Sequence, residues 1–315
     1  MKRLFSIIGL ALVLVACERS GAEPKGSGAL SPEDKQLFAL LPAGSTAVFG
    51  GNYMKLQQFM SSTLGKSTAA MMEKVGPGLQ EWTNCFTEKP VRLAGSGNVA
   101  GKGFEMRMVF SGYSIEQIGK CAARANMKAT VDPDGKFIAV DLPPPTNTTG
   151  YLLTSTGAIY TRQQMIISAA PTVTPASRSD LENDLKTAVA KNVIADDRLL
   201  ALIGKADRTK TVWFVGTGAN TPIADKLGEL VATLDLTNGL AMDLSFQLLD
   251  PSLVTKFDEG ITEMKKMSGS LPPSLKNAIE SIAFSHSGDR VRLAMKLDDK
   301  QLADVIQQAS MLGGN

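Results

Sequence analysis

The stretch VATLDLTNGLAMDLSFQLL, residues 231–249, decides the fold class of this chain. Asn238-Gly239 lies in its middle, and an Asn-Gly pair between two apolar runs is the strongest short signal for a two-residue β-hairpin turn. We therefore predict that Val231–Thr237 and Leu240–Leu249 are paired antiparallel strands.

Three more hairpins are predicted outward from this one. Strands over 91–99 and 104–112 flank a Gly-rich turn at 100–103, and Phe104, Met106, Met108 and Phe110 alternate so that one strand face is buried. Residues 127–141 form a hairpin around Asp132-Pro133-Asp134-Gly135, and residues 281–287 and 290–297 form one around Gly288-Asp289.

Segments with helical spacing and helix-start signals lie between these hairpins. Ser31-Pro32-Glu33-Asp34 supplies a hydroxyl cap, a first-turn proline and acidic residues at the positive end of the helix dipole. Ser114–Gln117 and Ser179–Glu182 have the spacing of capping boxes, and Asp298 precedes a final helix. Helices between hairpin-built strands indicate an α+β fold of antiparallel sheet with helices packed on one face.

The order of these elements repeats along the chain. Thr46–Phe49 corresponds to Thr211–Phe214, and in each case a strand pair, a capped helix and another hairpin follow. We expect two similar α+β modules, residues 31–175 and 176–315, related by internal duplication.

The first residues predict export and anchoring. Lys2 and Arg3 precede an apolar run over 4–15, which is too short to span a bilayer as a permanent helix and fits a secretory signal. The run ends in Leu14-Val15-Ala16-Cys17, which resembles the lipobox of bacterial lipoproteins. An ordinary signal peptide with an incidental cysteine is the alternative.

The lipoprotein resemblance implies a signal peptide over 1–16 and a lipidated, acylated Cys17 at the start of a flexible tether over 17–30. Two or more acyl chains hold a protein stably on a bilayer. Glu18 follows the cysteine in place of the Asp that typically retains such proteins at the inner membrane. The resemblance therefore favours the outer membrane, on its periplasmic side.

Charge and cysteine content restrict the partners and the redox state. Without Lys2 and Arg3, the 33 basic residues fall to 31 and equal the 31 acidic residues, so we expect no nucleic-acid partner. With Cys17 lipidated, Cys85 and Cys121 remain as an even pair in an oxidising compartment, which predicts a disulfide. Two buried free thiols are the alternative.

No pattern in the sequence supports catalysis, a cofactor or a metal site. The glycine run Gly95–Gly103 lacks the spacing of a phosphate-binding loop and precedes a strand. His286 is the single histidine, and no G-x-S-x-G motif accompanies it. Asp132-Pro133-Asp134-Gly135 is similar to the start of a calcium loop but lacks the later ligands.

The body of the chain loosely resembles uncharacterised bacterial envelope lipoproteins with duplicated α+β modules, through the segment Pro42–Asn52. We therefore expect a lipid-anchored, non-catalytic envelope protein that acts as a binding or scaffold module for a protein or envelope partner. The alternative is a carrier or chaperone for an apolar ligand, such as a lipid or lipoprotein, because the 14 methionines could line an adaptable groove.

Overall fold

The structure is a computed structural model. It describes residues 26–62, 65–66, 78–86, 92–100, 103–142, 149–166, 176–218 and 226–313. The predicted signal peptide, the lipobox residues Leu14 to Cys17 and the tether up to residue 25 lie outside the described residues, as does the boundary between the two predicted modules.

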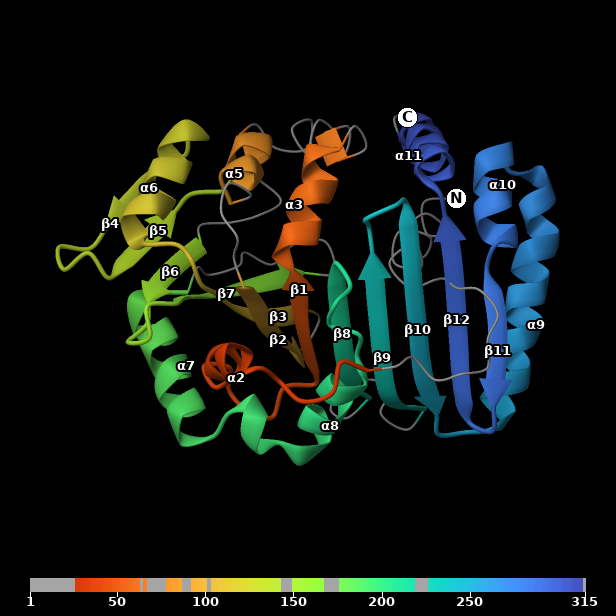
Figure 1. The fold of residues 1–315 in the computed structure, drawn as a ribbon, viewed down its shortest axis with the longest axis horizontal. Coiled ribbons are helices and arrows are strands. Elements are labelled where there is room, and N and C mark those ends of the chain that lie inside the picture. Colours follow the sequence, from red (N-terminus) through yellow and green to blue (C-terminus); the bar gives the residue numbers. More distant parts are fainter. Residues whose placement is uncertain are drawn as a thin grey trace.

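One antiparallel sheet of 12 strands organises the described residues (Figure 1). Its order is β11-β12-β10-β9-β8-β1-β2-β3-β7-β6-β5-β4. The strands are β1 (Ala47–Asn52), β2 (Arg92–Ala100), β3 (Gly103–Phe110), β4 (Ala129–Val131), β5 (Phe137–Val140), β6 (Thr149–Leu153), β7 (Ile159–Ile166), β8 (Val212–Thr217), β9 (Leu227–Asp235), β10 (Leu240–Leu248), β11 (Ala283–Ser287) and β12 (Arg290–Leu297).

The helices precede, follow or connect these strands. They are α2 (Pro32–Phe38), α3 (Tyr53–Ser61), α5 (Leu79–Phe86), α6 (Ile115–Arg124), α7 (Arg178–Ala190), α8 (Asp197–Lys205), α9 (Ser252–Met267), α10 (Pro273–Glu280) and α11 (Asp299–Gly313), with short 3-10 turns at Val193–Ala195 and Ser268–Ser270. The mixed α+β class is confirmed.

The predicted halves share one sheet through the pairing of β1 with β8. Phe49 lies opposite Phe214 in this antiparallel pair. Outward from the pair, β1-β2-β3-β7-β6 and β8-β9-β10-β12-β11 follow the same order, with α6 after β3 and α9 after β10. This order agrees with the expected duplication, which stays a prediction.

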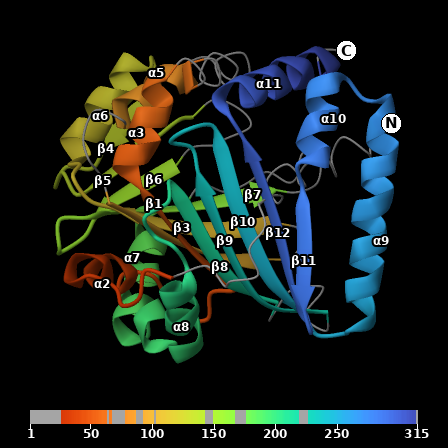
Figure 2. The ribbon, with the colours of Figure 1, turned by 45° about the vertical axis from the view of Figure 1, so that its right-hand side comes forward.

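The sheet has two unlike faces. The α2 face carries Val48, Val109 and Val215 and is covered in the β1–β7 half by α2, α7 and α8, whose core includes Phe38 and Leu181. The opposite face, called here the α6 face, is covered by α5 and α6 in one half and by α9, α10 and α11 in the other. Figure 2 shows α9 and α10 apart from the group of α2, α7 and α8.

In the β1–β7 half, helices therefore cover both faces of the sheet, whereas only one covered face was expected. Both faces of the β1–β7 half alternate apolar side chains, so both must be buried. In the half formed by β9, β10, β12 and β11, described helices pack on the α6 face, and Figure 1 shows these strands with no helix across them in the foreground.

Two local predictions need correction. The α7 cap is Ser177, whose side chain accepts from the Asp180 N–H, and not Ser179, so the helix begins two residues earlier than the Ser179–Glu182 spacing suggested. The sequence over Pro222–Leu230 also predicts a helix, and this prediction is wrong at its end, because β9 begins at Leu227 and pairs there with Leu248.

Candidate functional site

A strip of apolar side chains crosses the centre of the α6 face, and we call it the central strip. It consists of Phe49 on β1, Met106 and Met108 on β3, and Phe214 on β8. All four side chains are half-buried. None belongs to the core clusters formed by the described residues, although cores on the same face lie on both sides of the strip.

Glycines shape the floor of the central strip. A Cβ on Gly95 would lie 2.0 Å from Cζ of Phe49, so the Phe49 ring lies directly over the β2 backbone. A Cβ on Gly216 would lie 3.2 Å from Cε1 of Phe214. Glycine at these positions lets both aromatic rings lie against the sheet and widens the apolar floor.

The predicted disulfide between Cys85 and Cys121 is present and joins α5 to α6 beside this strip. The two Cα atoms are 5.5 Å apart. Both cysteines are buried in a core with Trp82 and Ile118, and Tyr113 donates its hydroxyl to the Cys85 carbonyl at 2.9 Å. Because α5 has only 8 residues, the bond and the buried tryptophan hold it on the sheet.

A charged cluster fastens α7 to the α2 face. Asp184 on α7 accepts from Nε of Arg107 at 3.2 Å and from Nη1 of Arg162 at 3.3 Å. The buried Tyr160 hydroxyl also donates to Asp184 at 3.3 Å, and burial together with that carboxylate raises the tyrosine pKa. Burial lowers the pKa of Arg107, but the hydrogen bond to Asp184 and the nearby charges of Asp184, Tyr160 and Glu105 together outweigh burial and raise the pKa.

Arg178 binds the turn Asp132-Pro133-Asp134-Gly135, whose sequence is similar to the start of a calcium loop. Arg178 donates to Asp132 at 2.9 Å, to Asp134 at 2.6 Å and to Glu182 at 2.8 Å. Hydrogen bonding from Arg178 lowers the pKa of the Asp134 carboxyl. The guanidinium thus neutralises the carboxylates of the turn.

A second charged cluster, around Asp235, joins α3 to the β8–β9 pair. Asp235 accepts from Nζ of Lys55 at 3.1 Å and of Lys210 at 3.3 Å, and from the Thr237 hydroxyl at 2.6 Å. Partial burial raises the pKa of Asp235, but the hydrogen bonds from Thr237, Lys55 and Lys210 outweigh burial and leave it well below its usual range.

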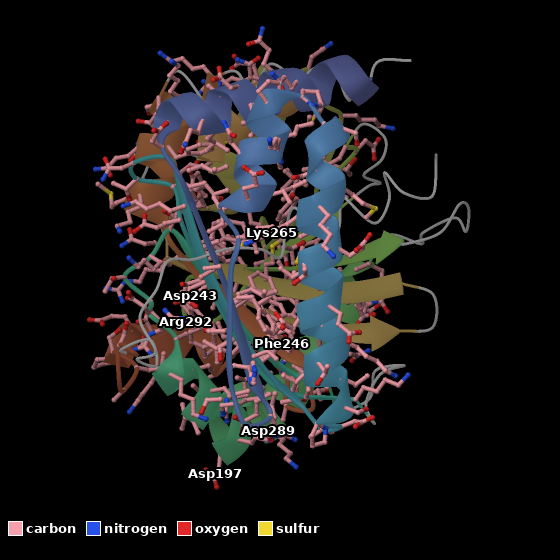
Figure 3. The ribbon with its side chains drawn as sticks, turned by 90° about the vertical axis from the view of Figure 1, so that its right-hand side faces the viewer. Asp197, Asp243, Phe246, Lys265, Asp289 and Arg292 are labelled. Atoms are coloured by element: carbon pink, nitrogen blue, oxygen red, sulfur yellow. A yellow bond between two sulfur atoms is a disulfide. The ribbon has the colours of Figure 1, made fainter. Side chains whose placement is uncertain are left out.

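The α2 face of the C-terminal half is polar, and we call it the open polar face: Glu229, Asp243, Ser245, Gln247, Arg290 and Arg292. Asp243 accepts twice from Arg292, at 3.0 Å and 2.6 Å. Figure 3 shows Asp243 and Arg292 on one side of the sheet and Phe246, which packs with α9, on the other.

His286, the lone candidate for catalysis, lies on the edge strand β11. Its side chain is exposed, and its ring lies 5.9 Å from that of Phe284. In the described ranges, no three His, Cys, Asp or Glu side chains converge in a way that could hold a metal ion. No helix there is both long enough and apolar enough to cross a membrane.

Sequence reasoning missed the two aromatic members of the central strip. It identified Met106 and Met108 through alternation, but Phe49 and Phe214 entered only as repeat positions. The available signal was the glycine content of β1 and β2, because glycines next to an aromatic residue in a strand mark a close approach across the sheet.

Comparison with known proteins identifies no family. No known protein family matches the sequence, and no curated protein matches it. Solved structures of TP0453 are distantly similar. Crystal form III has a TM-score of 0.43 and 13% identity over 86% of this chain and 97% of that chain. Crystal form I has a TM-score of 0.42 and 12% identity, with 86% and 96% covered. These values are too low to carry an argument about function.

Proposed function

We propose that this chain is a lipid-anchored, non-catalytic protein of the cell envelope that binds an apolar ligand, such as a lipid, on the central strip. The membrane anchor is Cys17, and the outer membrane is its proposed location. The observation that carries the binding role is the half-buried state of Phe49, Phe214, Met106 and Met108 between two cores of the same sheet face.

The chemistry of the strip supports an apolar ligand. Its members are two aromatic rings and two thioethers, and methionine adapts its shape to irregular apolar partners. The glycines beneath the rings keep the floor flat. Binding sites for small molecules are lined mostly by apolar side chains, and the strip is an apolar surface between two cores of the same sheet face.

A second candidate is a scaffold role toward a protein partner, and the open polar face favours it. Asp243, Arg292 and their neighbours form a broad polar sheet surface, which the described helix α8 reaches at β9. Polar sheet faces commonly lie in water, however, so this observation supports a partner less directly than the central strip supports a ligand.

Photo-crosslinking in intact cells tests the binding role. A photoreactive phenylalanine analogue replaces Phe214 in the full chain, and the same analogue replaces Val189 on α7, which is 80% exposed, as the control. We expect adducts of lipid mass at position 214 that are absent at 189. A protein-sized adduct at position 214 would favour the scaffold role over ligand binding. Equal labelling at both positions would refute binding on the strip.

Metabolic labelling with an alkyne-bearing palmitate tests the anchor separately. We expect the full chain to carry the label and to sediment with membranes. The variant Cys17→Ala should lose the label, whereas an unlabelled wild-type chain would refute lipidation without bearing on the strip.

A further inference from the structure

We propose that Arg208 clamps the end of the N-terminal tether on the α2 face, so that this face of the protein lies toward the membrane and the central strip faces away from it. The inference rests on the lipid anchor of the proposed function. It concerns an additional property, namely which surface meets the headgroup layer and which residues decide this.

The last residues of the predicted tether are docked against the end of α8. The Ser27 N–H donates to the Ala206 carbonyl at 3.0 Å, and the Gly28 N–H donates to the Gly204 carbonyl at 3.3 Å. The final carbonyls of a helix have no partner within the helix, so the tether supplies donors that α8 lacks. Leu30 then enters the core of the α2 face at 6% exposure.

Arg208 ties this segment from the other side. Its Nη1 donates to the Gly28 carbonyl at 2.9 Å and to the Ile203 carbonyl at 3.1 Å, while Nη2 donates to the Ala29 carbonyl at 2.7 Å. Its backbone N–H donates to the Ser27 hydroxyl at 2.8 Å. A single guanidinium therefore bridges the tether and the helix end, where its positive charge is also favourable.

Two glycines, Gly26 and Gly28, allow the tether to dock in this position, although glycine in a sequence usually suggests flexibility. A Cβ on Gly26 would lie 2.1 Å from the Gly204 carbonyl oxygen, so no larger residue fits without displacing the chain. Gly28 has φ +68°, a left-handed conformation that side chains disfavour. The segment is thus shaped for this position.

The clamp shortens the free part of the tether, and the shortened length limits the orientation. Gly26 is only nine positions after Cys17, so the chain between them spans at most about 30 Å. A compact body of this size is about 50 Å across. The chain between Cys17 and Gly26 would need most of its full extension to pass the edge of the sheet and reach the level of the α6 face, so docking of Gly26 favours an orientation with the α2 face toward the bilayer.

The open polar face continues from the docking point. Lys205, which lies beside Gly26, pairs with Glu229 at 3.1 Å, and Glu229 pairs with Arg290 at 2.9 Å. The charges named here are paired with one another, and the apolar residues that the strand register places on this face are small, such as Ala241 and Ala294, so the face suits the hydrated headgroup layer. The central strip lies on the opposite face of the same sheet and opens away from the bilayer.

Energy transfer to a membrane tests the orientation. The lipidated full chain is reconstituted on phosphatidylcholine vesicles that contain a rhodamine lipid, with one donor dye on either Lys296→Cys or Glu259→Cys. Both residues are exposed; the first lies on the α2 face of β12 and the second on α9. With Cys17 lipidated and Cys85 bonded to Cys121, the introduced thiol is the one that reacts.

We expect roughly twofold greater transfer from position 296, because a sheet layer and a helix layer put about 20 Å between the two dyes. Flotation with the vesicles is measured first. Failure to float would refute the lipid anchor and this inference with it. Flotation with equal transfer, or with greater transfer from 259, would overturn the orientation and leave the anchor intact.

The clamp is tested with Arg208→Ala in the same assay. Release of residues 26–30 would extend the free tether to about 45 Å, so the difference between the two dyes should fall by at least half. Arg198→Ala, an exposed arginine on α8, is the matched control and should keep the full difference. Gly26→Val displaces the tether without touching Arg208 and should reproduce the loss. A full difference in both clamp variants would overturn the role of Arg208.

Discussion

Replacement of Asp184 by asparagine should destabilise the fold more than any other single charge change in the described residues. Asp184 is 14% exposed and Arg107 is 13% exposed, so little water reaches their contact. The variant Asp184→Asn keeps the shape of the side chain and removes its charge. It leaves Arg107, Arg162 and the Tyr160 hydroxyl without the carboxylate to which all three donate.

The size of the effect follows from what the arginines retain. Removing one partner of a buried ion pair typically lowers the free energy of unfolding by about 3–5 kcal/mol. Arg107 keeps Glu105 at 2.6 Å and Arg162 keeps Asp180 at 3.9 Å, which compensates part of the loss. We therefore expect about 3 kcal/mol, which corresponds to a fall of roughly 6–10 °C in Tm.

Urea unfolding monitored by tryptophan fluorescence measures this loss, with thermal melting as a second measurement. Asp258→Asn on the exposed side of α9 is the matched control and should change the free energy by less than about 0.5 kcal/mol. A loss below about 1 kcal/mol for Asp184→Asn, the value of an ordinary surface pair, would refute the view that this cluster fastens α7 to the sheet.

Three further predictions follow from other contacts. Reduction, or Cys85→Ser with Cys121→Ser, should cost about 3–4 kcal/mol because the bond closes a 36-residue loop; an unchanged melting curve in reductant would contradict this. Gly95→Ala should destabilise by about 1–3 kcal/mol because its Cβ meets an aromatic ring, whereas Gly260→Ala in open space on α9 should stabilise by up to about 1 kcal/mol; melting curves with the same sign for both would argue against the ring placement. Asp235 has a folded-state pKa below its unfolded value, so its stabilisation is present above about pH 4 and is lost as pH falls further. The stability difference between wild type and Asp235→Asn should therefore be constant from pH 8 to about 5 and shrink below about pH 4, and a difference that grows on acidification would be inconsistent with that pKa.

The sequence predicted most of the hairpins because turns and alternation are local. The segment around Asn238-Gly239 joins β9 and β10 as an antiparallel pair, as predicted, but Ala241 lies opposite Asp235 and not Leu236, so the connection is longer than the predicted two-residue turn. The capping box of α6 is also present, since Ser114 and Gln117 exchange hydrogen bonds at 3.2 Å and 2.9 Å. Each of these features depends on residues only a few positions apart.

Sequence patterns gave the wrong secondary structure where the same residues fit both a helix and a strand. The segment ending at Leu230 was predicted as a helix, although residues 227–230 pair with β8 and β10. A short apolar run does not distinguish a buried strand from a helix, and the neighbouring strands decided the outcome. The sequence analysis predicted no element over 273–280, where the structure has α10 with Pro273 in its first turn.

The amino-acid sequence by itself determined the antiparallel α+β class, the cysteine pair and the positions of most turns, because these depend on short-range spacing and on the compartment implied by the first residues. Only the tertiary structure decided that two predicted sheets are one, that Asp184 meets an arginine 77 positions away and that Arg208 holds a tether segment 180 positions away. These contacts depend on how layers stack and on which faces remain to be buried. The same reason explains the central strip: its residues are apolar in the sequence, but whether they stay half-buried depends on which helices pack beside them.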